Sequence, residues 1–208
     1  MNEKGLVVVT ATAGSIPSSE RKKLEKNHRI SSAIMEQCAT VEEVLQHSDW
    51  FKGPLFLMIS DRKTLATIEI GPRGTFAVKK TTEGTLFHTN HYLDPEMQKF
   101  NQKIGDSSAT RFSRIQELLG EKKGSHALED FAAMSRDSVA GPDKSIWRTG
   151  STPTKTRTLA TWIVHQPIQG VPRLSVRIAN PDEAEQIFEA DCTSLFSEKE
   201  DRGAFPIK

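Results

Sequence analysis

Four short runs of strand-forming residues, each separated from the next by a turn, limit what this chain can fold into. The separators contain Gly, Pro or Asp, and this spacing is typical of an antiparallel meander. The segment Gly5–Thr12, with three consecutive valines, predicts a further buried strand near the start of the chain. The four runs are Leu55–Ser60, Leu65–Ile70, Thr75–Lys80 and Thr85–Thr89.

Helices are predicted both before and after the meander in the sequence. Ser19 is an N-cap candidate for a helix over Glu20–Gln37, and Thr40 with Glu43 forms a capping-box pattern for a short helix that ends near His47. Because strands and helices are grouped instead of alternating, the pattern favours an α+β fold over βαβ units. The remaining predicted elements are helices at Ser107–Leu119 and Ala127–Met134 and strands at Arg157–His165 and Leu174–Ala179.

The chain has 208 residues, which is enough for one domain with a substantial core. We expect that domain over 1–196, followed by a polar tail over 197–208. The net charge of +1 gives no field that would attract nucleic acid or a charged membrane, so neither partner is expected. The two cysteines do not form a disulfide framework and no signal-peptide pattern is visible, which together predict a cytoplasmic location.

No self-contained catalytic motif stands out: the chain lacks a GxSxG sequence, a P-loop, an HExxH helix and paired cysteines. His88 and His91 have a spacing that can bind zinc, but no third ligand is near, so two ordinary imidazoles are the favoured interpretation. Cys38 and Cys192 have no neighbouring base that would activate a thiol, so we interpret both as structural residues. We therefore expect no metal and no cofactor.

Asn90 allows two interpretations, because it follows a predicted strand and precedes a loop. An asparagine at that position commonly forms an Asx-turn, which is the favoured interpretation from composition alone. Alternatively, its amide points into a cleft and donates a hydrogen bond to a developing oxyanion.

Arg111 falls on the same helical face as the apolar residues Ile115 and Leu118. A guanidinium on an apolar face needs a partner, because an unpaired buried charge is very costly. Asp137 and Asp143 are both candidates. The sequence leaves open whether Arg111 is structural or lies beside an active-site cleft.

Several segments, in a shared order over most of Asn2 to about Phe196, resemble one family of enzymes. Phe87–Leu93 (Phe-His-Thr-Asn-His-Tyr-Leu) is similar to a His-Thr-Asn-His-Phe motif, and Ser108–Leu119 is similar to a Ser-x-x-Arg helix. The family comprises the acyl-coenzyme A:6-aminopenicillanic acid acyltransferases together with the choloylglycine hydrolases and penicillin acylases. Further similar segments are Asn2–Leu6 (Asn-Glu-x-Gly-Leu), Cys38–Glu43, Asp137, Pro142–Arg148 and Thr158–Thr161.

The resemblance implies a four-layered αββα sandwich of the N-terminal-nucleophile type. It also implies that a cysteine at a mature N-terminus attacks a linear amide or an acyl thioester, with its own α-amino group as the base. Asn90 would stabilise the oxyanion and Arg111 would lie near the nucleophile. His91, Tyr92 and Ser145 would contact the substrate.

Three departures from the family pattern raise a second hypothesis. The nucleophile of the family precedes the Asn-Glu-x-Gly-Leu strand, which here begins at Asn2, so we expect the nucleophile outside this chain. The stretch Thr10–Ala13 contains no second asparagine donor, and Trp147 and Thr149 replace Cys and His. The chain is then either part of an amide hydrolase or acyltransferase, or an inactive binding module that keeps the fold. In the first case we expect a complementary chain with the nucleophile, or self-association.

Overall fold

The computed structural model describes residues 1–197, which fall into two compact units, and the boundary between the units lies after Gln116. The first unit contains β1 (Val7–Ala11), α1 (Ser18–Arg21), α2 (Ile30–Gln37), α3 (Val41–Gln46), β2 (Leu55–Ser60), β3 (Leu65–Ile70), β4 (Phe76–Thr81) and most of α4 (Asp106–Gly120). It also contains three short 3-10 helices, Ser48–Trp50, Pro72–Gly74 and Gln98–Phe100. The second unit contains α5 (Leu128–Ser135), β5 (Ala160–His165), β6 (Arg173–Ile178), β7 (Gln186–Asp191) and α6 (Cys192–Ser197).

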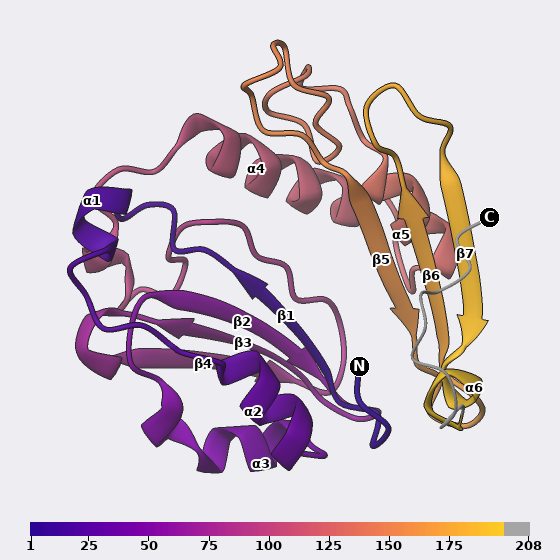
Figure 1. Cartoon of the computed structure of the whole chain (residues 1–208), viewed down its shortest axis with the longest axis horizontal. Helices are drawn as coiled ribbons and strands as arrows, with labels where there is room; N and C mark the ends of the chain where they lie inside the picture. Colours follow the sequence, from indigo (N-terminus) through magenta and orange to yellow (C-terminus); the bar gives the residue numbers. More distant parts are fainter. Residues whose placement is uncertain (198–208) are drawn as a thin grey trace. The chain divides into compact units, whose positions relative to one another are not determined.

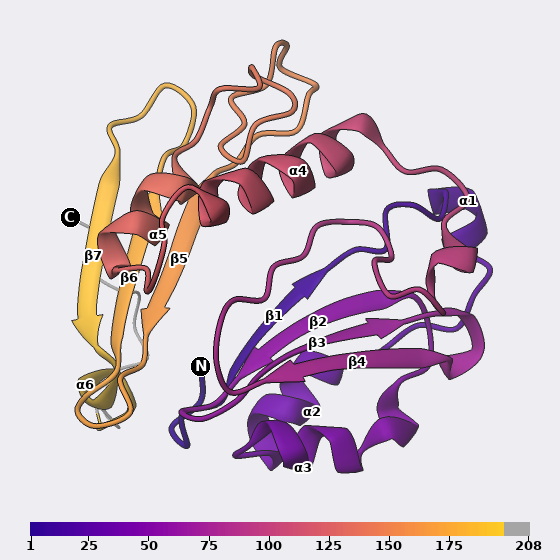
Figure 2. The ribbon, with the colours of Figure 1, turned by 180° about the vertical axis from the view of Figure 1, so that it is seen from behind.

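The first unit is built on an antiparallel sheet with the strand order β1-β2-β3-β4. Helices α2 and α3 lie on one face of this sheet (Figures 1 and 2). Alternate strand residues point to that face and form its core with the helices, as expected where one face of a sheet is buried. The buried members of this core include Leu57, Ile59 and Ile68 from the strands and Ile34 and Val41 from the helices.

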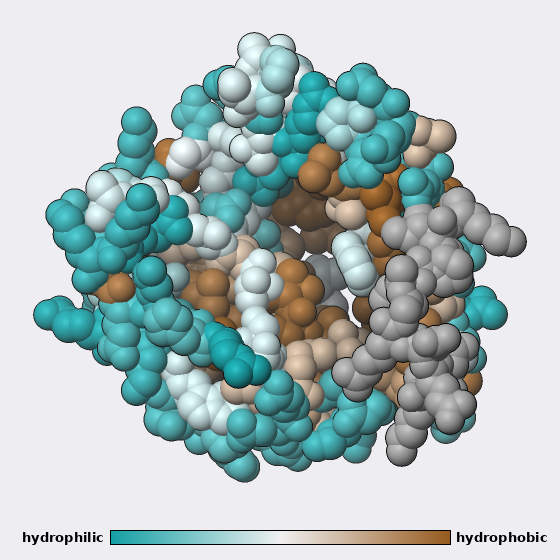
Figure 3. All heavy atoms as spheres, in the orientation of Figure 1, coloured by the Kyte–Doolittle hydropathy of each residue, from teal (hydrophilic) through white to brown (hydrophobic). Residues whose placement is uncertain are grey.

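A smaller cluster lies on the opposite face of the same sheet. Phe56 of β2 packs there against Ala13, Ile16, Tyr92 and Met97, all of which are buried. These residues come from the segments that follow β1 and β4, so the loop that carries Asn90 is anchored directly to the sheet. The outer surfaces of α1, α2 and α3 are largely hydrophilic, whereas apolar residues gather over β1 and β2 (Figure 3).

The predicted helix over Glu20–Gln37 is wrong in one respect, because α1 and α2 are separate helices. Between them the chain folds against Gly53: the Asn27 amide donates to the Gly53 carbonyl and accepts from the backbone N–H groups of Lys52 and Gly53. A Cβ at Gly53 would come within 1.7 Å of the Glu25 carbonyl oxygen, so only glycine allows this approach. This tertiary contact overrides the local helix propensity.

The predicted strand over Thr85–Thr89 is also wrong, because this segment joins no sheet. It leaves the meander after β4 and runs over the face of the sheet that α2 and α3 do not cover. The other predicted strands of the meander are confirmed, with bounds that differ by at most one residue from those predicted, and β1 pairs with β2. Thr40 caps α3 as predicted, since its side chain accepts a hydrogen bond from the Glu43 N–H.

The second unit contains an antiparallel sheet with the order β5-β6-β7, and α5 contacts β5. Together the two units give a mixed fold with two antiparallel sheets and several helices in the described part of the chain. The sequence analysis missed β7 and α6. From residue 198 onward, the predicted polar tail lies outside the described residues. No helix within 1–197 is long and apolar enough to cross a membrane.

The buried side chain of Asn2 gives a structural reason for the Asn-Glu-x-Gly-Leu segment at Asn2–Leu6. Its amide nitrogen donates to the carbonyls of Met35 and Cys38 at the end of α2, and its Oδ1 accepts from the Leu6 N–H. Asn2 is 4% exposed, and Leu6 behind it is completely buried. The asparagine therefore connects the entry into β1 with the C-terminal end of α2.

Replacing Asn2 with Ala should lower the free energy of unfolding by about 2 kcal/mol, because it leaves buried carbonyls without a donor. Urea denaturation followed by circular dichroism measures this loss. The exposed neighbour Glu3→Ala is the matched control and should change stability little. Equal stability of both variants would contradict the role given to Asn2.

Candidate functional site

The side chain of Asn90 is held at both ends of its amide. Its Oδ1 accepts a hydrogen bond from Arg111 Nη2 at 2.9 Å, and its Nδ2 donates to the carbonyl of Thr12 at 3.0 Å. The positively charged donor fixes which end of the amide is oxygen, so the nitrogen must point the other way. Because Nδ2 carries two hydrogens, one remains for another acceptor. The Asn90 carbonyl also accepts from the Ser15 N–H.

Helix α4 places two side chains against this loop from one face. Ser108 and Arg111 are three residues apart and therefore point the same way. The Ser108 hydroxyl oxygen accepts from the Asn90 N–H at 2.8 Å and lies 2.9 Å from His91 Nδ1 and 3.1 Å from Thr89 Oγ1. The Ser-x-x-Arg pattern thus has a physical purpose: the serine holds the backbone of the loop and the arginine holds its amide.

Arg111 has a polar partner that the sequence did not indicate, the side-chain oxygen of Asn90. Its Nη2 donates to Asn90 Oδ1, and its Nε donates more weakly to Ser107 Oγ at 3.4 Å. Asp143 binds the hydroxyl and the N–H of Ser151 in the second unit. The amide oxygen of Asn90 is a partner that the sequence did not indicate, and it places the guanidinium directly beside the Asn90 side chain.

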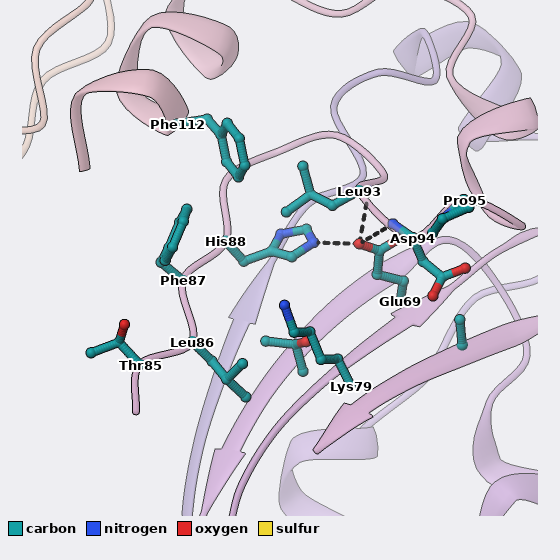
Figure 4. A pocket seen from close by; sticks show the side chains of 12 residues that line it. Glu69, Lys79, Thr85, Leu86, Phe87, His88, Leu93, Asp94, Pro95 and Phe112 are labelled. Atoms are coloured by element: carbon teal, nitrogen blue, oxygen red, sulfur yellow. Dashed lines mark hydrogen bonds and ion pairs between the residues drawn. The ribbon is translucent and has the colours of Figure 1, made fainter. Parts of the chain in front are cut away.

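Glu69 in β3 holds the same loop from the sheet. Its Oε1 accepts from the N–H of Leu93 at 2.8 Å and lies 3.0 Å from His88 Nε2, and both of its oxygens lie 3.3 Å from the Asp94 N–H. These contacts are on both sides of Asn90 in the sequence. Figure 4 shows these contacts, through which Glu69 fixes both ends of the segment that contains Asn90.

His88 forms a buried ion pair with Glu69. The two side chains are 2% and 6% exposed. His88 Nδ1 lies 2.8 Å from the carbonyl oxygen of Thr89, which can only accept, so this nitrogen carries a proton. Nε2 lies 3.0 Å from a carboxylate oxygen that also accepts from a backbone N–H group, so His88 and the loop backbone hold the same end of Glu69.

Sequence reasoning missed Glu69, although a signal was present. It is the acidic residue in an otherwise uncharged strand, Leu65–Ile70. Period-two alternation places it on the face away from Ile68 and Ile70, which is the face that the Asn90 loop covers. A buried carboxylate needs donors, and a loop rich in N–H groups supplies them.

The three predicted substrate contacts are buried. His91 is 7% exposed, Tyr92 1% and Ser145 0%. Tyr92 donates its hydroxyl hydrogen to the Ile70 carbonyl, and burial raises the pKa of its phenol well above the usual value. Ser145 lies in the second unit and donates to the Gly141 carbonyl. Each side chain has an internal structural role, and substrate contact by any of them stays a prediction.

Neither cysteine of the chain is suited to act as a nucleophile. Cys38 is 0% exposed and Cys192 is 3% exposed. Burial raises the pKa of both thiols, which disfavours the reactive thiolate. Within residues 1–197 no three metal-ligating side chains gather in one place.

The segment that departs from the family pattern is packed in the second unit. The Trp147 ring lies under the Arg177 guanidinium, 4.1 Å from ring centroid to Cζ, and Thr149 is exposed. Arg148 is half-buried, and burial lowers the pKa of its guanidinium. Trp147 thus has a structural partner that a smaller residue at this position would lack.

A family model of the acyl-coenzyme A:6-aminopenicillanic acid acyl-transferases matches residues 1–179. The chain belongs to this family. The match includes Asn90, Arg111 and Ser145, and it extends over both units. Membership in this family indicates an acyltransferase or amide-hydrolase type of function. No curated protein matches the chain.

Replacing Glu69 with Gln should lower the free energy of unfolding by about 3 kcal/mol, because His88 would lose its buried counter-ion. Urea denaturation measures the change. The exposed Glu83→Gln is the matched control and should leave stability unchanged within about 0.5 kcal/mol. A stable Glu69→Gln variant would show that the carboxylate does not anchor the loop.

Stability should also depend on the protonation of His91. Burial, aided by His88, lowers the pKa of His91 below its ordinary value of 6.5, so the folded state favours the neutral ring. As the pH falls below about 6.5, the unfolded chain binds this proton more readily than the folded chain, and stability falls. The loss between pH 7 and pH 5 should therefore be smaller in His91→Gln. Identical pH profiles would refute this assignment.

Proposed function

We propose that this chain forms part of an N-terminal-nucleophile enzyme that cleaves or transfers an acyl group from a linear amide or an acyl thioester. The observation that carries the proposal is the Asn90 amide, whose oxygen is held by Arg111 and whose nitrogen keeps a hydrogen for a further acceptor. A donor fixed before the substrate arrives is what oxyanion stabilisation requires. Membership in the acyl-transferase family supports the same reaction type.

In the proposed reaction a cysteine at a mature N-terminus transfers its thiol proton to its own α-amino group. The sulfur attacks the carbonyl carbon, and the carbonyl oxygen becomes an oxyanion that accepts from Asn90 Nδ2. When this intermediate collapses, the C–N bond breaks and the α-ammonium group gives its proton to the departing amine; with a thioester, the C–S bond breaks and a thiolate departs. Water or an acceptor amine then attacks the acyl-enzyme and regenerates the thiol.

In this proposal the nucleophile is not one of residues 1–208. Cys38 and Cys192 are buried and their thiol pKa values are raised, which leaves neither able to attack a substrate. The nucleophile would be on a preceding segment or on a complementary chain. The proposed αββα sandwich is supported by the pairing of sheet and helix in each unit: β1–β4 with α2 and α3, and β5–β7 with α5.

In the active assembly, Asn90→Ala should lower kcat by about 10²–10³-fold, because it removes one oxyanion donor. Steady-state kinetics on a linear amide measures this loss, and circular dichroism checks that the variant is folded. Asn180→Ala is the matched control, since Asn180 binds Glu183 on the surface of the second unit. Unchanged kcat in Asn90→Ala, together with specific ligand binding, would favour the inactive binding module.

We also propose that β1 pairs with a further strand, from a complementary chain or a second copy. The strand is the outermost of its sheet, and its residues Val9 and Thr10 are exposed. At the opposite edge, β4 carries Lys79 and Lys80, which discourage pairing. β1 has no charged residue, and Val9 is 49% exposed.

If β1 is a pairing edge, the isolated chain should self-associate at micromolar concentration, and Val9→Lys should shift it toward monomer. Light scattering after size-exclusion chromatography measures the mass. Val139→Lys, at an apolar residue that is 77% exposed in the second unit, is the matched control. A monomeric wild-type chain, or an equal effect of both variants, would contradict this proposal.

A further inference from the structure

A cavity of about 310 Å³ lies over β3 and β4, next to the loop that carries Asn90 (Figure 4). Asn90 itself does not line it, because its side chain turns toward Thr12 and Arg111. The volume is at the lower end of the range found for small-molecule sites. Apolar walls are formed by Leu86, Phe87, Leu93, Pro95 and Phe112.

Two polar groups without partners meet on the floor of this cavity. Thr67 of β3 and Lys79 of β4 are directly paired across the two strands. The structure gives neither side chain a hydrogen bond or an ion pair within the described residues. Figure 4 shows the Lys79 side chain directed into the cavity, on the side of His88. The next residue, Lys80, points to the opposite face of the sheet and pairs with Glu42.

The other charged groups around the cavity are already engaged. Glu69 lies 3.0 Å from His88 Nε2 and accepts from backbone N–H groups. Asp94 accepts from the Glu96 N–H in a local turn, and its carboxylate lies on the far side of Glu69 from the Lys79 ammonium in Figure 4. Lys79 is therefore the charged lining residue that is free to bind a ligand.

We propose that this cavity binds an organic carboxylate with an apolar body of roughly six to eight carbons, a size that suits the cavity volume. The carboxylate binds Lys79 Nζ and the Thr67 hydroxyl, and the apolar body packs on Leu86, Phe87 and Phe112. The cavity offers a charge-assisted contact at one end and apolar walls at the other. A simple anion would leave the apolar walls unused, and a neutral hydrocarbon would leave the ammonium unused. The idea that this cavity recognises one end of the substrate rests on the proposed function. Binding of the organic carboxylate does not depend on that function.

Titration calorimetry of the full chain with octanoate tests the site, with octanamide as the neutral isostere. Octanoate should bind saturably with a Kd of about 1 mM or tighter. Lys79→Met should weaken binding about tenfold or more, and Thr67→Val about threefold. Lys80→Met is the matched control, because it removes the same charge from the opposite face, and it should leave the Kd unchanged.

Three outcomes would overturn the proposal: no saturable binding, equal binding of octanamide, or equal effects of Lys79→Met and Lys80→Met. Asn90→Ala should bind octanoate as the wild type does, because Asn90 does not line the cavity. Failure of the oxyanion role therefore shows as unchanged turnover in Asn90→Ala, whereas failure of the carboxylate site shows as unchanged octanoate binding in Lys79→Met.

Discussion

The buried Glu69 carboxylate fixes the position of the loop that carries the candidate catalytic residue. It receives hydrogen bonds from His88 on one side of Asn90 and from Leu93 and Asp94 on the other. Burying a carboxylate is costly unless it is paired and hydrogen-bonded, so these contacts favour one arrangement of the loop over the alternatives. The sheet that carries Glu69 thereby determines where the Asn90 amide lies.

Helix α4 adds the second constraint, on orientation. Ser108 holds the backbone of Asn90 and Arg111 holds its side-chain oxygen. An asparagine amide without such contacts could rotate and present its oxygen where a donor is required. The positive charge of Arg111 makes that rotation unfavourable, because the nitrogen end of the amide would then face a guanidinium. The sheet, through Glu69, therefore fixes where the Asn90 amide lies, and helix α4 fixes how the amide is oriented.

Local sequence patterns predicted the meander strands and the helix α3, because β-branched alternation and a capping residue act over a few neighbours. They failed where distant contacts decide the structure. The helix predicted over Glu20–Gln37 is broken by the contact between Asn27 and Gly53, and the segment Thr85–Thr89 leaves the sheet to cover its face. The sequence singled out Asn90 and Arg111 separately, but their direct contact depends on tertiary folding that no periodicity reveals.

The exposure of the charged groups predicts how each responds to dissolved salt. Glu69 and His88 are enclosed, so counter-ions cannot approach closely enough to screen their attraction, and the placement of Asn90 should persist at high ionic strength. Lys79 is open to solvent, and its attraction for an anion weakens as the Debye length shortens. Ionic strength would thus act on the capture of a charged ligand while it leaves the geometry of the amide unaltered.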